Sequence, residues 1–344
     1  MTPLAVKGLG MRSCLGGGAE WNAAIMRCGY SNFFPTDFIG RNPGEPYLGA
    51  RIEGLDPLGG IARYVEMAAA VIEETLGGER KALPTLPLIC CLPRPEDLPA
   101  EDFHEEFNQR LLARLEITSL ARDSVFYYLG RSAAADAFYT ARECLEAGHP
   151  SVLVVAADTL LSARRIAGYG HGSAQPRLLD GGMPDGFIPG EAAVALRLGK
   201  TDADGTQTCI TGLGFGEEEA TVDSDLPLLG EGLTQAVREA AKRAGVRVSD
   251  TDFRLSSANG EGYFFEETAL VASRTLEEKR DIWPLWQPAD HIGEVGAAAG
   301  PAMVVMAHYA FAKGYAPGPR ALCQLSGDDS RRSAFIMERK TNSP

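Results

Sequence analysis

Hydrophobic positions along the chain follow two alternating patterns. Short apolar runs predict buried strands at 4–10, 86–92 and 152–156, whereas apolar residues spaced three or four apart predict an amphipathic helix at 60–76. Further strands are expected at 191–198, 209–215, 253–258, 322–325 and 333–338, and further helices at 105–115, 132–147, 226–244, 264–276 and 296–312. Strands that alternate with helices predict βαβ units with a mainly parallel sheet, and therefore an α/β fold.

The same pattern divides the chain into two halves. The polar segment 200–206 predicts a linker between residues 1–199 and 206–344. Gly8-Leu9-Gly10 recurs as Gly212-Leu213-Gly214, and the helix start at 131–135 has a counterpart at 295–299, with Ser132 matched to Gly296. Two matches in the same order predict a duplicated architecture.

Composition narrows the class of protein. With 344 residues, of which 45% are hydrophobic and 23% charged, the chain can bury a large core. Seven scattered cysteines do not suggest a disulfide framework, so we expect a reducing, cytoplasmic environment. No run approaches the length of about 18 apolar residues that a membrane span needs, so membrane insertion is not expected.

Charge and motif spacing argue against several kinds of ligand. A net charge of -13 disfavours general nucleic-acid binding and favours neutral or basic partner surfaces. The Gly8-x-Gly10 motif lacks the third glycine of a dinucleotide-binding loop. His291 and Glu294 offer two metal ligands without a third. We therefore expect no cofactor and no metal ion.

Two segments carry a family resemblance. Residues 185–193 read DGFIPGEAA and residues 294–300 read EVGAAAG. They resemble hallmark segments of the β-ketoacyl synthases, which belong to the thiolase-like condensing-enzyme superfamily, and residues 8–16 and 257–262 are similar to further segments. The resemblance implies a duplicated thiolase-like fold in five layers, α-β-α-β-α. In that fold two helix N-termini converge, so Arg131 and Glu294 are expected to face each other.

The chain departs from this family at all three catalytic positions. By resemblance, Arg131 stands at the nucleophilic cysteine, Asn259 at the first histidine and Glu294 at the second. A guanidinium stays protonated and is not a nucleophile, and an ionised Glu294 would repel the enolate that a histidine stabilises. We therefore expect a degenerate, catalytically incomplete member of the family.

Arg131 is expected to have an acidic partner. A positive charge at a helix N-terminus lies beside the positive pole of the helix dipole, which costs about 0.3–1 kcal/mol. Glu294 has the opposite sign and is the expected partner. The C-terminal loop at 327–332, which differs from the family's glycine-rich loop, offers Asp328 or Asp329 as further candidates.

Ser132 is a candidate nucleophile of a different kind. Residues 130–134 approximate the serine elbow of hydrolases, with His171 or His291 as a candidate base. Serines are also ordinary at this place in the condensing enzymes, where Ser132 would satisfy backbone donors of the helix. An acyl-thioester transferase or hydrolase that uses Ser132 stays an alternative.

The resemblance leaves three functions open. The first is an inactive adaptor or scaffold, and similar short ketosynthase-like proteins encoded beside type VI secretion effector genes imply a role in effector loading. The second is a partner of an active ketosynthase that resembles a chain-length factor, and the third is the Ser132 enzyme. A homodimer or heterodimer is expected, with the strand at 152–156 pairing across its axis. The expected protein partners are a secretion effector, a ketosynthase or an acyl carrier protein.

Overall fold

An 11-stranded mixed sheet runs through the part of the chain that the computed structural model describes, which is residues 1–41, 44–55, 58–77, 80–172, 176–181, 185–278 and 280–342. The first arm of the sheet has the order β1-β8-β7-β5-β6, and the second has the order β9-β13-β12-β10-β11. The two arms join where Leu4 and Ala5 of β1 pair with Ile210 and Cys209 of β9. The strands of the first arm are β1 (Leu4–Ser13), β5 (Leu88–Leu92), β6 (Val125–Tyr128), β7 (Ser151–Thr159) and β8 (Glu191–Gly199). Those of the second are β9 (Gly205–Glu217), β10 (Phe253–Ser256), β11 (Leu285–Trp286), β12 (Arg320–Ser326) and β13 (Arg331–Asn342).

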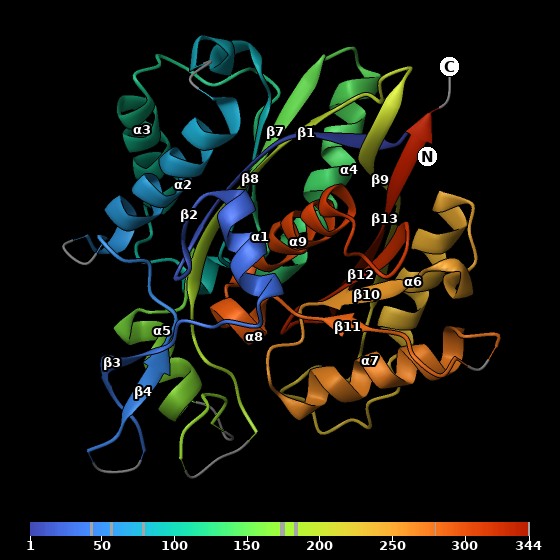
Figure 1. The fold of residues 1–344 in the computed structure, drawn as a ribbon. Coiled ribbons are helices and arrows are strands. Elements are labelled where there is room, and N and C mark those ends of the chain that lie inside the picture. Colours follow the sequence, from blue (N-terminus) through green and yellow to red (C-terminus); the bar gives the residue numbers. More distant parts are fainter. Residues whose placement is uncertain are drawn as a thin grey trace.

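Helices cover the arms and fill the space between them (Figure 1). They are α1 (Ala19–Arg27), α2 (Gly60–Leu76), α3 (Phe103–Leu115), α4 (Ala133–Glu146), α5 (Ala163–Ala167), α6 (Glu231–Ala244), α7 (Gly262–Thr275), α8 (Ala289–Ile292) and α9 (Ala299–Lys313). Two 3₁₀ turns, η3 (Gly130–Ser132) and η6 (Gly296–Ala298), lead into α4 and α9. A short strand β2 (Gly16–Gly17) and a hairpin of β3 (Phe34–Ile39) and β4 (Pro46–Gly49) complete the strands named here.

Alternation along the strands shows how the layers are stacked. Ile89 of β5 faces the central core with α4 and α9, whereas Cys90 packs with α2 and α3 on the outer face. In the second arm Phe335 faces the central core and Ile336 packs with α6. Side chains on a strand alternate between its two faces, so each arm is covered on both sides. The result is the predicted α-β-α-β-α order (Figure 1).

The duplication is visible in the backbone of the two helix starts. Gly130 and Gly296 both have φ of 53°, in the left-handed region that favours glycine. Ser132 (φ -78°, ψ -12°) and Ala298 (φ -80°, ψ -11°) then match closely. The backbone therefore repeats at the two helix starts. The sequence analysis matched Ser132 to Gly296, but the structure matches Ser132 to Ala298. The division into 1–199 and 206–344 stays a prediction. In the structure β8 ends at Gly199 and the next strand, β9, begins at Gly205.

Two expectations about the sheet were wrong. The sheet is mixed and not mainly parallel, because β1, β8, β9 and β13 pair antiparallel with their neighbours. The apolar run at 152–156 lies in β7, which pairs with β5 on one side and β8 on the other, and is buried along its whole length. The strand at the end of the first arm is β6, which the sequence analysis missed and whose residues are only partly buried. A continuous apolar run is typical of an interior strand, because both of its faces are covered. No helix in the described part of the chain is long and apolar enough to cross a bilayer.

Candidate functional site

The two segments that carry the family resemblance meet in space. The Glu294 N–H donates to the Ile188 carbonyl at 2.8 Å, and the Gly190 N–H donates to the Glu294 carbonyl at 2.8 Å. A Cβ at Gly190 would collide with the carbonyl oxygen of Ile292, so the close approach requires glycine there. These contacts fix the Glu294 backbone against the first half of the chain.

Arg131 lies in η3, the turn that leads into α4, and is the centre of the site. Its Nη1 lies 3.2 Å from Glu294 Oε2, and the side chains of the two residues are 5% and 4% exposed. Its Nη2 donates to Asp328 Oδ1, and its guanidinium carbon lies 4.4 Å from the ring centroid of Phe264. The pairing expected from the sequence is therefore confirmed for Glu294 and for Asp328. Asp329, the other loop candidate, accepts instead from the Arg331 N–H at 3.0 Å.

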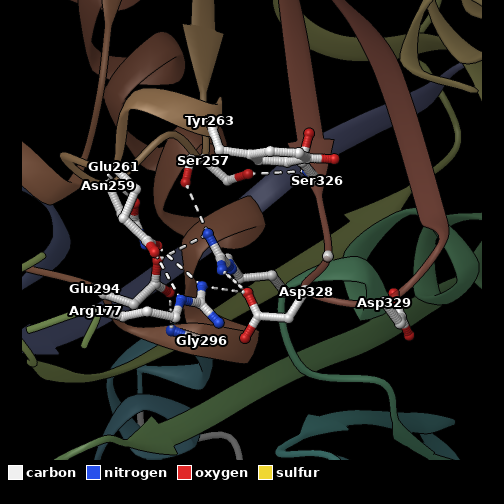
Figure 2. Close-up of polar contacts among 12 residues, drawn as sticks. Arg177, Ser257, Asn259, Glu261, Tyr263, Glu294, Gly296, Ser326, Asp328 and Asp329 are labelled. Carbon is white, nitrogen blue, oxygen red and sulfur yellow. Dashed lines mark hydrogen bonds and ion pairs between the residues drawn. The ribbon is translucent and has the colours of Figure 1, made fainter. Parts of the chain in front are cut away.

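A second arginine shares the same acids. Arg177 donates through Nε and Nη2 to both oxygens of Glu261, at 2.6 and 2.9 Å, and through Nη2 to Asp328 Oδ1 at 2.9 Å. Asp328 thus bridges two guanidinium groups. Figure 2 shows Arg177, Glu294 and Asp328 turned toward one another. We call Arg131, Arg177, Glu261, Glu294 and Asp328 the buried charge cluster.

Asn259, which the resemblance places at the first histidine, contacts this cluster. Asn259 Nδ2 donates to Glu261 Oε2 at 3.0 Å, and Asn259 Oδ1 accepts from the Glu261 N–H at 3.3 Å. Its amide is therefore engaged by protein groups. The N–H groups of the second helix start are engaged as well, since Gly296 donates to Glu294 Oε1 at 2.7 Å and Ala297 donates to Asp158 Oδ2 at 2.9 Å.

Further charged groups extend the network outward. Arg94 Nη2 lies 3.8 Å from Asp328 Oδ2, and the Tyr169 hydroxyl donates to the same oxygen at 3.3 Å. Arg165 Nη1 lies 2.7 Å from Asp158 Oδ1. Buried charges are stable only when paired and hydrogen-bonded, and this arrangement meets that condition through shared partners.

Burial and pairing act in opposite directions on the pKa values of these groups. Burial would raise the pKa of Asp328, but the charges of Arg131 and Arg177 outweigh it and lower the pKa. Burial also raises the pKa of Glu294, and there it prevails over the lowering effects of Arg131 and the Gly296 N–H. Burial disfavours the charge of Arg131, yet Glu294 and Asp328 raise its pKa above the usual value. Arg131 therefore stays cationic and Asp328 stays anionic.

Little space is left directly beside Arg131, whereas a separate cavity of about 340 Å³ is lined by Arg177 and Asp328 of the same cluster. The cavity beside Arg131, Glu294 and Asp328 has a volume of about 20 Å³, and no cysteine or histidine lines it within the described residues. A single buried water needs about 10–15 Å³, so the cavity holds a water but not an acyl chain. The side chains of the cluster fill most of the space around Arg131.

The other candidate residues do not assemble into a catalytic site in the described part of the chain. The Ser132 hydroxyl is buried and has no hydrogen-bond partner there, so no base contacts it. His291 Nδ1 lies 3.1 Å from the Tyr30 carbonyl oxygen, away from Ser132, and the side chain of His171 lies outside the described residues. No group of residues in the described ranges is suited to hold a metal ion.

Arg177 and Glu261 are site residues that the sequence analysis missed. Arg177 follows a segment with no periodic pattern, and its partner Glu261 is 84 positions away in the chain. The available signal was the position of Glu261, two residues after Asn259 in a segment that resembles the condensing enzymes.

Comparison with known proteins rests on structure alone. No family model and no curated protein sequence matches the chain. A chain in the complex of a type II polyketide synthase acyl-carrier protein with its ketosynthase superposes with a TM-score of 0.77 at 16% identity, covering 98% of this chain and 99% of that one. The ishigamide ketosynthase/chain length factor gives 0.76 at 14% identity, covering 98% and 99%. A ketosynthase from module 6 of the bacillaene synthase of Bacillus subtilis 168 gives 0.76 at 13%, covering 98% and 72%. The chain has the thiolase-like ketosynthase fold.

Proposed function

We propose that this protein is a catalytically inert, ketosynthase-like adaptor or scaffold that binds other proteins. The observation that carries the proposal is the buried charge cluster, because it replaces the nucleophile and fills the site. Arg131 cannot accept an acyl group, and the cavity of about 20 Å³ admits no acyl chain. Glu294 and Asp158 already occupy the N–H donors at the second helix start.

The complexes in which similar chains are found support a protein partner. One similar chain comes from a complex with an acyl-carrier protein, and another from a ketosynthase paired with a chain length factor. For this chain we propose a secretion effector as the partner, in the loading step of type VI secretion. A ketosynthase or an acyl carrier protein is the alternative partner, and would make the protein comparable to a chain-length factor.

The site itself favours the adaptor over the chain-length factor. A factor that shapes an acyl cavity needs an apolar tunnel, whereas the cavity beside Arg131 is small and lined by charged groups. In favour of the factor, one of the similar chains comes from a ketosynthase in complex with its chain length factor from Xenorhabdus doucetiae.

Dimer formation is part of the proposal. β6 ends the first arm and has one strand neighbour, β5, so its other edge is open to pairing within the described residues. Such an edge is an aggregation liability unless another chain covers it. We therefore propose that β6 pairs across a homodimer axis, or with β6 of a related subunit in a heterodimer.

Chemical inertness is tested by intact-protein mass spectrometry after incubation with acyl-CoA and acyl-carrier-protein thioesters. We expect no acyl adduct and no thioester loss above the rate without protein. An active ketosynthase in the same assay is the positive control. Turnover that disappears in Ser132→Ala would establish the serine enzyme instead.

Partner identity is tested by affinity capture from the native host, with quantitative mass spectrometry against a tag-only control. Enrichment of a secretion effector supports the adaptor, whereas enrichment of a ketosynthase with its carrier protein supports the chain-length-factor alternative. Reconstitution with the purified partner and size-exclusion chromatography then establishes whether contact is direct.

A further inference from the structure

A cleft separate from the cavity beside Arg131 lies between α4 and the inner face of the second arm. We call it the interlayer cleft, and its volume is about 580 Å³. This is within the range of about 300–1,000 Å³ that is typical of ligand pockets. Its lining consists of Ser132, Asp136, Tyr139, Phe215, Gly216, Glu217, Gln235, Arg331, Arg332 and Ser333.

Two buried hydroxyl groups line this cleft without a partner. Ser132 Oγ and Ser333 Oγ have no hydrogen-bond partner in the described chain, and each residue is 2% exposed. A buried polar group without a partner costs about 1–3 kcal/mol, so two of them in one cleft are unfavourable unless something bonds to them. Both oxygens have almost no accessible surface as they stand, so a ligand with hydrogen-bonding groups removes this cost when the two serine side chains rotate toward the cleft.

The walls of the cleft combine an aromatic surface with a negative charge. The rings of Tyr139 and Phe215 meet edge to face with centroids 6.4 Å apart. Arg331 Nη2 lies 2.9 and 3.0 Å from the two oxygens of Asp136, so these charges offset each other. Within the described residues Glu217 makes no ion pair, and it lies directly across from Arg331 in the register of β9 and β13. Arg331 therefore faces two carboxylates, Asp136 and Glu217, and this wall of the cleft carries one negative charge in excess. The cleft therefore favours a ligand with an apolar group and a positive charge.

An edge of β9 that has no strand neighbour within the described residues borders the cleft at Phe215, Gly216 and Glu217. β1 pairs with β9 only at Cys209 and Ile210, so the rest of β9 toward Glu217 has no strand on that side in the described chain. The Phe215 N–H there already donates to Glu239 Oε2 at 3.0 Å. The Ser132 and Ser333 hydroxyls, rather than a complete strand ladder, must then supply the polar contacts.

We propose that the interlayer cleft binds an extended peptide segment of a partner protein. A large apolar side chain packs against Tyr139 and Phe215, peptide groups bond to the two serine hydroxyls, and a lysine or arginine faces Glu217. Each serine hydroxyl both donates and accepts, which suits a peptide group. The net charge of -13 adds attraction for a basic segment. This inference rests on the proposed protein-binding function but not on the inertness of the site around Arg131.

The geometry also explains how one turn serves two sites. Arg131 and Ser132 are consecutive residues of η3, and Arg131 contacts the buried charge cluster while Ser132 lines the interlayer cleft. The cluster holds this turn in place from one side. A rigid wall loses little conformational entropy when a peptide binds to it, whereas a mobile wall would have to be ordered first. The smaller entropy cost favours affinity.

The test is a random heptapeptide display library selected on the purified protein, followed by fluorescence anisotropy with the enriched peptide. We expect a consensus of one large apolar residue and one basic residue. Ser132→Ala/Ser333→Ala should weaken binding by about tenfold or more, because two hydrogen bonds are lost. The same variant should keep or raise the melting temperature, because it removes two unpaired buried groups. Glu217→Lys should reverse the preference for basic peptides, and Trp21→Ser, on an exposed part of α1, should bind as the wild type does.

Other outcomes overturn the proposal. No consensus, unchanged binding in the double serine variant, or a preference for basic peptides that survives Glu217→Lys would each exclude this peptide site. A lower melting temperature in the double serine variant together with unchanged binding would show that the hydroxyls serve packing only. None of these readouts uses an acyl donor, so failure here is distinguishable from acyl turnover that would overturn chemical inertness.

Discussion

Removal of the Arg131 charge should lower the free energy of unfolding. Glu294→Gln should lower it in the wild type, but should raise it once the Arg131 charge is gone. The test variants are Arg131→Met and Glu294→Gln, because both keep most of the side-chain volume. Arg131 contacts Glu294 at 3.2 Å and also binds Asp328, so Arg131→Met deprives two buried carboxylates of a partner. Asp328 keeps Arg177 at 2.9 Å, whereas Glu294 is left with the Gly296 N–H.

The magnitudes follow from these contacts. Arg131→Met should lower the free energy of unfolding by about 3–5 kcal/mol, which is typical when one side of a buried ion pair is removed. Glu294→Gln should cost only about 1 kcal/mol, since Arg131 keeps Asp328 and the new amide oxygen can still accept from Gly296. In the Arg131→Met background, Glu294→Gln removes the stranded carboxylate, so the double variant should recover about 1–3 kcal/mol.

Urea denaturation followed by circular dichroism measures all four proteins of this cycle. Arg110→Met is the matched control, because Arg110 pairs with Glu106 on the exposed face of α3 and should contribute less than about 1 kcal/mol. Additive losses in the cycle, or an Arg131→Met variant no less stable than the control, would refute the coupled buried pair.

Three further outcomes are expected. Asp328→Asn should be less stable than the wild type at neutral pH, and the gap should narrow as the pH falls below the ordinary carboxyl pKa of 3.8. The reason is that a carboxyl whose pKa is lowered in the folded state contributes stability above its unfolded-state pKa, and this stability is lost at lower pH. Urea midpoints of both proteins across acid pH measure the difference in stability, and a difference that stays constant with pH contradicts the prediction. Arg131→Cys alone should release no carbon dioxide from malonyl thioesters, because Asn259 and Glu294 remain, and measurable release would show that the other positions suffice. Light scattering at micromolar concentration should report a dimer, and a monomer alone would count against pairing through β6.

The order of elements was predictable from the sequence, and the residue types at 131, 259 and 294 are the basis of the prediction that the chain is catalytically incomplete. Periodicity identified α2 at its observed bounds and located most of the strands, because burial of one helix face or of a whole strand leaves a local signature. The opposite charges of Arg131 and Glu294 also predicted their contact once the resemblance placed both at converging helix starts. Residue type alone established that Arg131 is not a nucleophile.

Only the tertiary structure decided what fills and surrounds the site. Arg177 and Glu261 are separated by 84 positions, so no local pattern links them. Asp328 was one of two loop candidates for the partner of Arg131, and only the structure decided between it and Asp329. The open edge at β6 was missed because a half-buried strand of four residues gives a weak signal, while the strongest apolar run marks the interior strand β7. Cavity size and unpaired hydroxyls depend on how distant side chains pack, and packing is a property of the folded chain rather than of any segment.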